Sequence, residues 1–270
     1  MPNKKAVPIK VSRGKTARGA KKVQPRKGGS RTAAAVPACV ARSRIELRGL
    51  QTTVVKHMES NPALLVVHGT GCGKTLSAVT ASQCYLDSFP KNHVVFVGPA
   101  ALAENFRKEM RGYGVRNPDR YQVFSFDGFF GLLKQMTGRT GPGPKRKKRV
   151  SPLPDLKSAL VIVDEAHNLR NAGSMRSSAI VSAVAAAHKR LLLTATPFVN
   201  RLTDFNPLLT ILHGGEEKLA TARRMGNFEK AIGNRIAAKN LTQLRTLLAN
   251  KLHYADCQGC SAFPCKEEHV

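Results

Sequence analysis

Residues 68–75 read HGTGCGKT, and they join a short apolar run at 63–67 to a segment with helical spacing at 74–86. A strand, a glycine-rich turn and a helix N-terminus in this order predict a phosphate-binding loop. Backbone N–H groups of such a loop point at the phosphate oxygens, and the helix dipole adds partial positive charge. We expect Lys74 to reach the β- and γ-phosphates of a nucleotide, and the Thr75 hydroxyl to ligate Mg²⁺.

The loop departs at one position from the G-x-x-x-x-G-K-[ST] pattern, because His68 stands where the pattern has glycine. The G-x-G-K-T core, with Gly71 and Gly73, is intact. The alternative is a solvated glycine-rich turn without a ligand, but the flanking strand and helix favour a nucleotide site.

The charge of the chain is strongly one-sided. Its 44 Lys and Arg residues outnumber 17 Asp and Glu residues, which gives a formal net charge of +27. Such a balance predicts a polyanionic partner, most simply nucleic acid. An anionic membrane surface is the weaker interpretation, because no basic amphipathic helix stands out. No run of about 18 apolar residues predicts a membrane span.

The N-terminus has no apolar core of the secretory type, so we expect a protein that is not secreted, although the basic composition of residues 1–48 leaves a transit peptide open. Six cysteines scattered over the chain do not suggest a disulfide framework. Cys72 inside the loop suits a reducing compartment.

Two basic segments interrupt the pattern. Residues 1–44 have no apolar periodicity and are predicted to be a disordered tail, either an arm for nucleic-acid phosphates or a solvated tail without a specific role. Residues 138–154 are predicted to be a flexible insertion. Its basic cluster resembles a nuclear-localisation signal and equally suits a phosphate-binding loop, with a merely solvated insertion as the alternative; the cluster consists of Lys145, Arg146, Lys147, Lys148 and Arg149.

A second motif follows an apolar strand at 159–163, where the sequence continues Asp164-Glu165-Ala166-His167. In a phosphate-loop ATPase, the first carboxylate holds Mg²⁺, and a neighbouring one can polarise the attacking water. These acids could also be only the polar end of a strand. Another apolar run, 190–193, leads into Thr194-Ala195-Thr196-Pro197, whose hydroxyls can relay changes at the phosphate or be ordinary loop residues.

Other patterns complete the prediction. A helix ending near Met58 carries Gln51, whose amide could read an adenine edge or lie exposed. Residues 204–254 are mostly helical in pattern, with a core stripe at Leu241, Leu244, Leu247 and Leu248. Further elements are strands at 94–97 and 121–126, and helices at 100–110, at 128–136 with Asp127 as its cap, and at 174–187.

The chain ends with Cys257, Cys260, Cys265 and His269, whose spacing suits a small zinc knuckle. Incidental free cysteines are the alternative, because no fold surrounds the cluster to orient it.

The three motifs together resemble motifs I, II and III of superfamily-two helicases, in that order. The sequence TPFVN at 196–200, followed by Leu208-Leu209, is similar to the stretch after motif III in Swi/Snf-type remodelling ATPases. Helicase-like ATPases of large DNA viruses, including the poxvirus-type nucleoside triphosphate phosphohydrolases, share these features. A histidine opening the phosphate loop resembles that viral branch more than the cellular remodellers.

The resemblance implies an ATP- and Mg²⁺-binding RecA-like lobe over residues 45–256, a three-layer α/β fold with a mostly parallel sheet. It implies that Lys74, Thr75 and Asp164 contact phosphate or metal, that Glu165 activates water, and that Gln51 reads adenine. It further implies that residues 99–102 contact nucleic acid, DNA more than RNA, and that three residues couple hydrolysis to that site: His167, Thr194 and Thr196.

The family's second lobe, with motifs IV to VI and the arginine fingers, has no counterpart after Pro197. Residues 257–270 resemble the start of the linker to it. We therefore expect lobe one alone, slow in hydrolysis because an arginine finger contributes about 10³–10⁵ in rate, and a second lobe or partner in trans. The alternatives are a non-enzymatic nucleic-acid-binding or packaging protein on a relic fold and, less favoured, a self-sufficient helicase. The expected location is the nucleus, or the virion or viral factory if the chain is viral.

Overall fold

The computed structural model describes residues 37–136, 153–171, 173–197, 205–222, 244–255 and 267–269. All of them belong to one unit of the chain, Val36–Val270. The predictions for the tail before residue 37, for Lys145–Arg149 and for a zinc site at Cys257, Cys260 and Cys265 lie outside the described residues.

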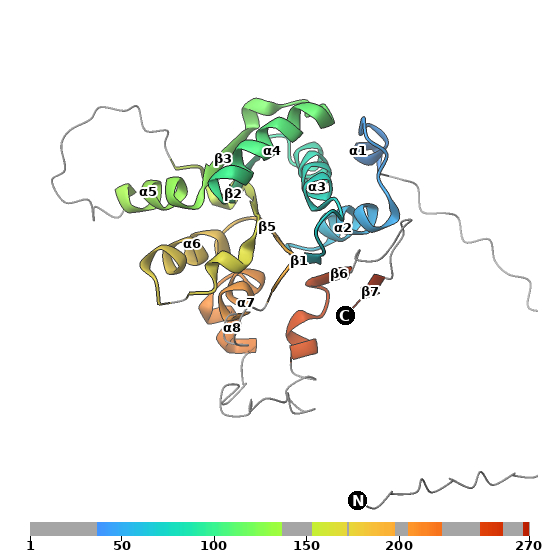
Figure 1. The fold of residues 1–270 in the computed structure, drawn as a ribbon. Coiled ribbons are helices and arrows are strands. Elements are labelled where there is room, and N and C mark those ends of the chain that lie inside the picture. Colours follow the sequence, from blue (N-terminus) through green and yellow to red (C-terminus); the bar gives the residue numbers. More distant parts are fainter. Residues whose placement is uncertain are drawn as a thin grey trace, which may run out of the picture. The chain divides into compact units, whose positions relative to one another are not determined.

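A seven-stranded sheet forms the centre of the described part, in the order β3-β2-β4-β5-β1-β6-β7 (Figure 1). Neighbouring strands are parallel except for the antiparallel pair β6 and β7. The expected α/β fold with a mostly parallel sheet is therefore confirmed. The strands are β1 (Ala63–His68), β2 (His93–Gly98), β3 (Tyr121–Ser125), β4 (Ala159–Val163), β5 (Lys189–Thr194), β6 (Leu252–Ala255) and β7 (Glu267–His269).

Helices cover both faces of the sheet (Figure 1). In β1, Leu64 and Val66 belong to one core, and Leu65 and Val67 belong to the other. Such strands, buried on both sides, read as continuous apolar runs. On the first face lie α1 (Ala38–Ala41), α2 (Gly49–Ser60), α3 (Lys74–Ser88) and α4 (Ala100–Tyr113); on the second lie α5 (Phe126–Met136), α6 (Met175–Ala185), α7 (Asn206–His213) and α8 (Glu216–Ala222). Short 3₁₀ turns are η1 (Pro118–Arg120), η2 (Leu156–Ser158) and η3 (Ala166–Leu169).

The strand order explains why the three motifs meet. Strand β5 lies between β1 and β4, and all three run in parallel, so their carboxyl ends share one edge of the sheet. In α/β sheets this edge is where ligands bind. The phosphate loop follows β1, the acidic motif follows β4 and the threonine motif follows β5.

The start of α5 differs from the prediction. The helix begins at Phe126, so Asp127 is inside its first turn and is not the cap. The Ser125 Oγ accepts the hydrogen bond from the Gly128 N–H at 3.0 Å instead. Asp127 is turned to another partner, because its carboxylate forms an ion pair with Arg176 of α6 at 2.8 Å.

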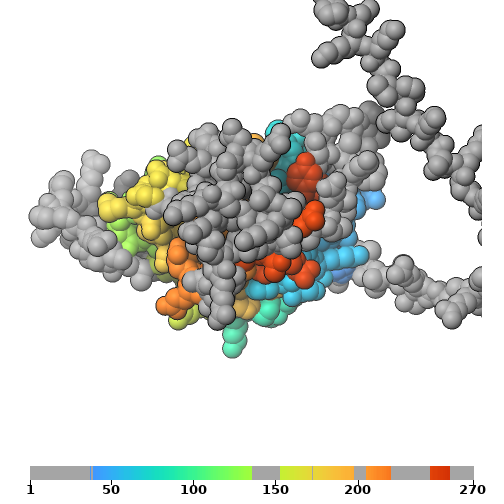
Figure 2. Space-filling model, turned by 90° about the horizontal axis from the view of Figure 1, so that it is seen from below, coloured from blue at the N-terminus to red at the C-terminus, as the bar shows by residue number. Residues whose placement is uncertain are grey.

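Strand β6 lies inside a stretch predicted to be mostly helical. Residues 244–248 are helical, with Leu244, Leu247 and Leu248 buried as predicted. The chain then turns at Asn250, which has a positive φ of 56°, and its carbonyl lies 2.8 Å from His57 Nε2 of α2. Figure 2 shows residues 244–255 in red beside the blue of α2. Pairing with β1 stabilises this four-residue strand, whose sequence LHYA carries little periodicity of its own.

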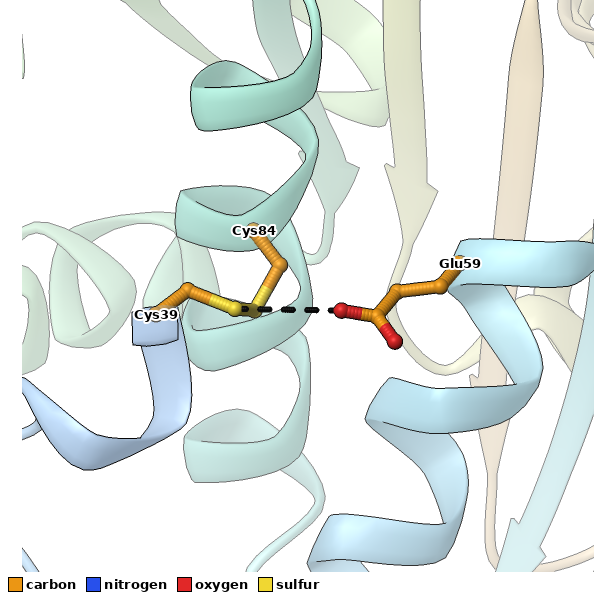
Figure 3. A group of neighbouring side chains, drawn as sticks. All are labelled: Cys39, Glu59 and Cys84. Carbon is orange, nitrogen blue, oxygen red and sulfur yellow. Dashed lines mark hydrogen bonds between the residues drawn. A yellow bond between two sulfur atoms is a disulfide. The ribbon is translucent and has the colours of Figure 1, made fainter. Parts of the chain in front are cut away.

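A disulfide joins Cys39 of α1 to Cys84 of α3, across 45 residues (Figure 3). Glu59 Oε1, at the end of α2, lies 3.9 Å from Cys39 Sγ. Cys72 is disulfide-bonded as well. The expectation of a chain without a disulfide framework is therefore wrong, and helix α1 adds structure in the segment expected to be a disordered tail. Spacing alone gives no sign of this pairing, because the two cysteines meet only once α1 packs on α3.

Within the described ranges, no helix has the length and apolar character needed to cross a membrane.

Candidate active site

The phosphate loop connects the end of β1 to the start of α3, as predicted. Gly71 has a φ of 84°, and Gly73, which precedes α3, has a φ of 73°. Residues other than glycine rarely adopt this left-handed backbone conformation. A Cβ at Gly73 would also lie 2.3 Å from Gln51 Nε2, whereas the same position at Gly71 faces open space. The loop therefore has the backbone freedom and the close approach that a phosphate cradle needs.

Gln51 is positioned against this loop by α2. Its side chain is 5% exposed, so the alternative of an exposed helical glutamine is wrong. Its Oε1 accepts a hydrogen bond from the Arg48 N–H at 2.9 Å, which closes the first turn of the helix. The Nε2 group is turned toward Gly73. Gln51 thus lies against the phosphate loop in this structure, and adenine reading remains a prediction.

Lys74, the first residue of α3, points back over the loop. Its Nζ donates hydrogen bonds to the carbonyl oxygens of His68 at 3.0 Å and Gly69 at 3.3 Å. An ammonium group held by two carbonyls can exchange them for phosphate oxygens, which bind it more strongly because they are charged. Thr75 follows in the same turn and is partly buried.

Asp164 continues the line of β4 and is almost buried. Its N–H donates to the Val97 carbonyl at 2.9 Å, and its Oδ1 accepts from the Glu165 N–H at 2.9 Å. Burial raises the pKa of the Asp164 carboxyl to about 6, and the Glu165 charge adds to this, while Lys74 opposes it. A carboxylate and the Thr75 hydroxyl are the hard oxygen ligands that suit Mg²⁺. A bound Mg²⁺ would supply positive charge that favours the ionised carboxylate.

Glu165 is held in a strained conformation. Its φ of 48° and ψ of 51° place a residue other than glycine in the left-handed region. Strain of this kind costs about 1–3 kcal/mol and is typical of functional sites. The Asn168 Nδ2 group donates to the Glu165 carbonyl at 2.9 Å and stabilises the turn. The Glu165 Oε2 then lies 3.2 Å from His167 Nδ1.

A hydrogen-bonded chain links the second motif to the third. His167 Nδ1 lies 3.1 Å from Thr194 Oγ1, and the same oxygen accepts a hydrogen bond from the Thr196 N–H at 3.1 Å. Thr194 is buried at the end of β5, and Thr196 is exposed just after it. The structure therefore brings together the three residues that the sequence predicts for coupling, His167, Thr194 and Thr196, and places Glu165 beside His167.

The sequence did not reveal the partner of His68. His68 Nε2 lies 2.7 Å from Nδ1 of His253, 185 residues further along the chain. The two meet because β6 pairs with β1, with Val66 opposite His253. A strand prediction at 252–255 would have been the only route to this contact, and the pattern there is too short to give one.

Comparison with known proteins supports the resemblance. A model of the SNF2-related domain matches residues 121–254. A putative ATP-dependent RNA helicase, L538, of Acanthamoeba polyphaga mimivirus is 28% identical over 226 residues, which cover 84% of this chain and 45% of that protein. The human DNA repair and recombination protein RAD54B is 25% identical over 203 residues, covering 63% of this chain and 21% of that protein.

Solved structures agree on the fold. The Sulfolobus solfataricus SWI2/SNF2 ATPase core in complex with dsDNA aligns with a TM-score of 0.55 at 14% identity, covering 80% of this chain and 46% of that one. The chain thus spans less than half of the length of each of these relatives. The three motifs, the fold and the match to the SNF2-related domain together support a superfamily-two helicase-like ATPase.

Proposed function

We propose that the protein is the ATP-binding lobe of a nucleic-acid-dependent ATPase. Lys74 and the phosphate loop bind the phosphates, Thr75 and Asp164 hold Mg²⁺, and Glu165 activates the attacking water. His167, Thr194 and Thr196 report the state of the phosphate to the nucleic-acid site. DNA is the favoured nucleic acid, and the nucleus or a viral factory is the proposed location.

One observation carries this proposal: His167 Nδ1 lies 3.2 Å from Glu165 Oε2 and 3.1 Å from Thr194 Oγ1, and this Oγ1 accepts a hydrogen bond from the Thr196 N–H. A polar strand end with no function would not need a strained glutamate, nor a histidine that lies between a carboxylate and a buried hydroxyl. An arrangement that joins the acidic motif to the next loop is expected of a site whose chemistry has to be sensed elsewhere.

The arginine fingers of the family do not appear among the motifs of these 270 residues. We therefore propose that this chain alone binds Mg-ATP but turns it over slowly, and that a second lobe, supplied in trans or by a longer protein, is needed for full activity.

The test is ATP turnover with and without DNA, for the wild type, for Lys74→Ala and for Glu165→Gln. We expect Mg-ATP binding in the wild type and in Glu165→Gln, and much weaker binding in Lys74→Ala. Binding that is unchanged in Lys74→Ala would sink the proposal. ATP-driven strand separation by the purified chain would contradict the need for a second lobe.

The second candidate is a nucleic-acid-binding or packaging protein that uses the ATPase fold only as a scaffold. The net charge of +27 favours it. It predicts binding to DNA without sequence preference, with the logarithm of the affinity falling by about 0.9 per phosphate contact for each unit of log salt.

Two variants separate these candidates. Under the second one, DNA binding survives Lys74→Ala unchanged and is lost when residues 1–44 are deleted. Tight DNA binding by the shortened chain, or a DNA affinity that responds to ATP, would argue for the first candidate instead.

A further inference from the structure

The phosphate loop contacts β6 through three of its residues. The Gly69 N–H donates to the Ala255 carbonyl at 3.2 Å, His68 is hydrogen-bonded to His253, and buried Cys72 packs with Leu50 and Ala255. His68, Gly69 and Cys72 therefore all contact the same short strand. A shift of β6 would therefore move the loop as well.

The two histidine rings form a buried polar pair. His68 is fully buried and His253 is 1% exposed, and their rings meet edge to face with centroids 5.0 Å apart. At 2.7 Å, one of the two nitrogens has to donate and the other has to accept. Burial, then the neighbouring His253 and Lys74, lowers the pKa of His68 to about 3, so this ring is neutral at pH 7. The neutral His68 ring can therefore take part in this hydrogen bond as donor or as acceptor, depending on its tautomer.

The backbone does not need glycine at residue 68. His68 is the last residue of β1, and it is absent from the described residues with a positive φ. Its side chain reaches His253 of β6. His68 in place of glycine thus adds a contact to His253, and the backbone conformation at this position is open to any residue.

We propose that His68 and His253 are positioning residues for nucleotide binding. Their hydrogen bond fixes the end of β1 against β6 and so fixes the His68 carbonyl, one of the two oxygens that hold the Lys74 ammonium. The pair determines where Lys74 and the loop amides stand before the phosphates arrive. This inference rests on the proposed nucleotide binding.

The experiment uses amide side chains as position-specific mimics of imidazole. A glutamine amide stands close to the place of a histidine Nε2, and an asparagine amide stands close to that of Nδ1. Because His68 uses Nε2 and His253 uses Nδ1, the variants His68→Gln and His253→Asn keep the hydrogen bond. His253→Leu removes it, and His253→Gln misplaces it. A matched control is His188→Leu. His188 immediately precedes β5, at the amino end of that strand, and its Nδ1 is hydrogen-bonded to Tyr85 Oη.

Two quantities are measured on the full chain: the Kd of a fluorescent ATP analogue with Mg²⁺, and hydrogen exchange of the amides of residues 69–73. We expect His253→Leu and His253→Gln to weaken binding about fivefold and to speed the exchange by a similar factor, as one lost hydrogen bond would. The mimics and the control stay within about twofold of the wild type.

If His253→Leu fails to fold, the contrast between His253→Asn and His253→Gln still decides. Equal losses in these two variants, or no loss in His253→Gln, would overturn the positioning role while the wild type still binds Mg-ATP. A wild type that binds no more nucleotide than Lys74→Ala overturns the proposed function as well, so the two failures are distinguishable.

Discussion

Polar side chains lie in or near the core at both ends of the central strands. The amino ends of the strands form what we call the amino edge of the sheet, and the carboxyl ends form the carboxyl edge; the contacts of the polar groups differ between the two. At the amino end of β5, Lys189 donates to the carbonyls of Met58 and Glu59 at the end of α2. Next to it, Arg190, only 8% exposed, donates to Ala185 and Ala187 at the end of α6, at 3.0 and 3.4 Å. Cations at helix C-termini satisfy carbonyls that the helix leaves open.

At the carboxyl end of the same strands, the polar groups contact loop atoms, occupy a strained backbone conformation or have a shifted pKa. Lys74 rests on two loop carbonyls, Glu165 is strained, and burial raises the pKa of Asp164. The difference teaches that buried charge alone does not mark a site. The amino edge stabilises the fold with cations whose carbonyl partners belong to the scaffold, whereas the carboxyl edge keeps groups whose partners can be exchanged.

The largest expected effect is on catalysis at the carboxyl edge. Glu165→Gln removes the proposed base and keeps the shape of the side chain, so ATP turnover should fall about 10³-fold. Binding of Mg-ATP should stay within about twofold of the wild type. Steady-state turnover and nucleotide titration check the two halves of this prediction, and a turnover that is unaffected would remove Glu165 from the mechanism.

The next effect is on binding. Lys74→Ala should weaken Mg-ATP binding about 100-fold, because a charge-assisted contact to phosphate is lost. The free energy of unfolding should change by less than about 0.5 kcal/mol, since partly exposed Lys74 supports no packed element. A nucleotide titration with urea denaturation on the same sample tests this, and a large loss of stability would contradict the comparison of the two edges.

Arg190→Met should show the opposite behaviour. Burial lowers the pKa of Arg190, yet its guanidinium closes the end of α6, and methionine of similar length leaves the two carbonyls without this donor. We expect the free energy of unfolding to fall by about 2 to 3 kcal/mol. Nucleotide affinity measured on the folded fraction should remain within twofold, and a selective loss of affinity would blur the distinction between the edges.

The smallest effect concerns pH. Burial lowers the pKa of His68 to about 3 in the folded chain, below the usual histidine value of 6.5. Below pH 6.5 the His68 imidazole binds a proton in the unfolded chain but stays neutral in the folded chain. The free energy of unfolding therefore falls as the pH drops from 6.5 toward 3. Between pH 7.5 and 5, His68→Gln should lose up to about 2 kcal/mol less than the wild type in urea denaturation. Equal losses would show that the ring, which faces His253 and Lys74, is not kept neutral.

The sequence was informative where the chemistry is local. Continuous apolar runs predicted β1, β2, β4 and β5, because parallel strands buried on both faces have this composition. The residues after them, such as Lys74 and Asp164, follow directly in the chain, so the motifs could be located without a structure. The strand order then shows that these motifs meet at the carboxyl ends of neighbouring strands.

The remaining features depend on contacts between distant parts of the chain. The partner of His68 and the disulfide of Cys39 arise only when β6 joins β1 and α1 packs on α3. Asp127 had the right residue type for a cap, but Ser125 took that role and Arg176 drew the carboxylate away. In each case the local pattern was open to several outcomes, and tertiary packing selected one.

The bond between Cys39 and Cys84 also has a topological consequence. It closes the chain into a covalent ring that contains α2, β1, the phosphate loop and most of α3. A protease that cuts once inside this ring leaves the two fragments joined, and they would separate on a gel only after reduction. The phosphate loop therefore stays attached to the rest of the chain after a single cut within this ring.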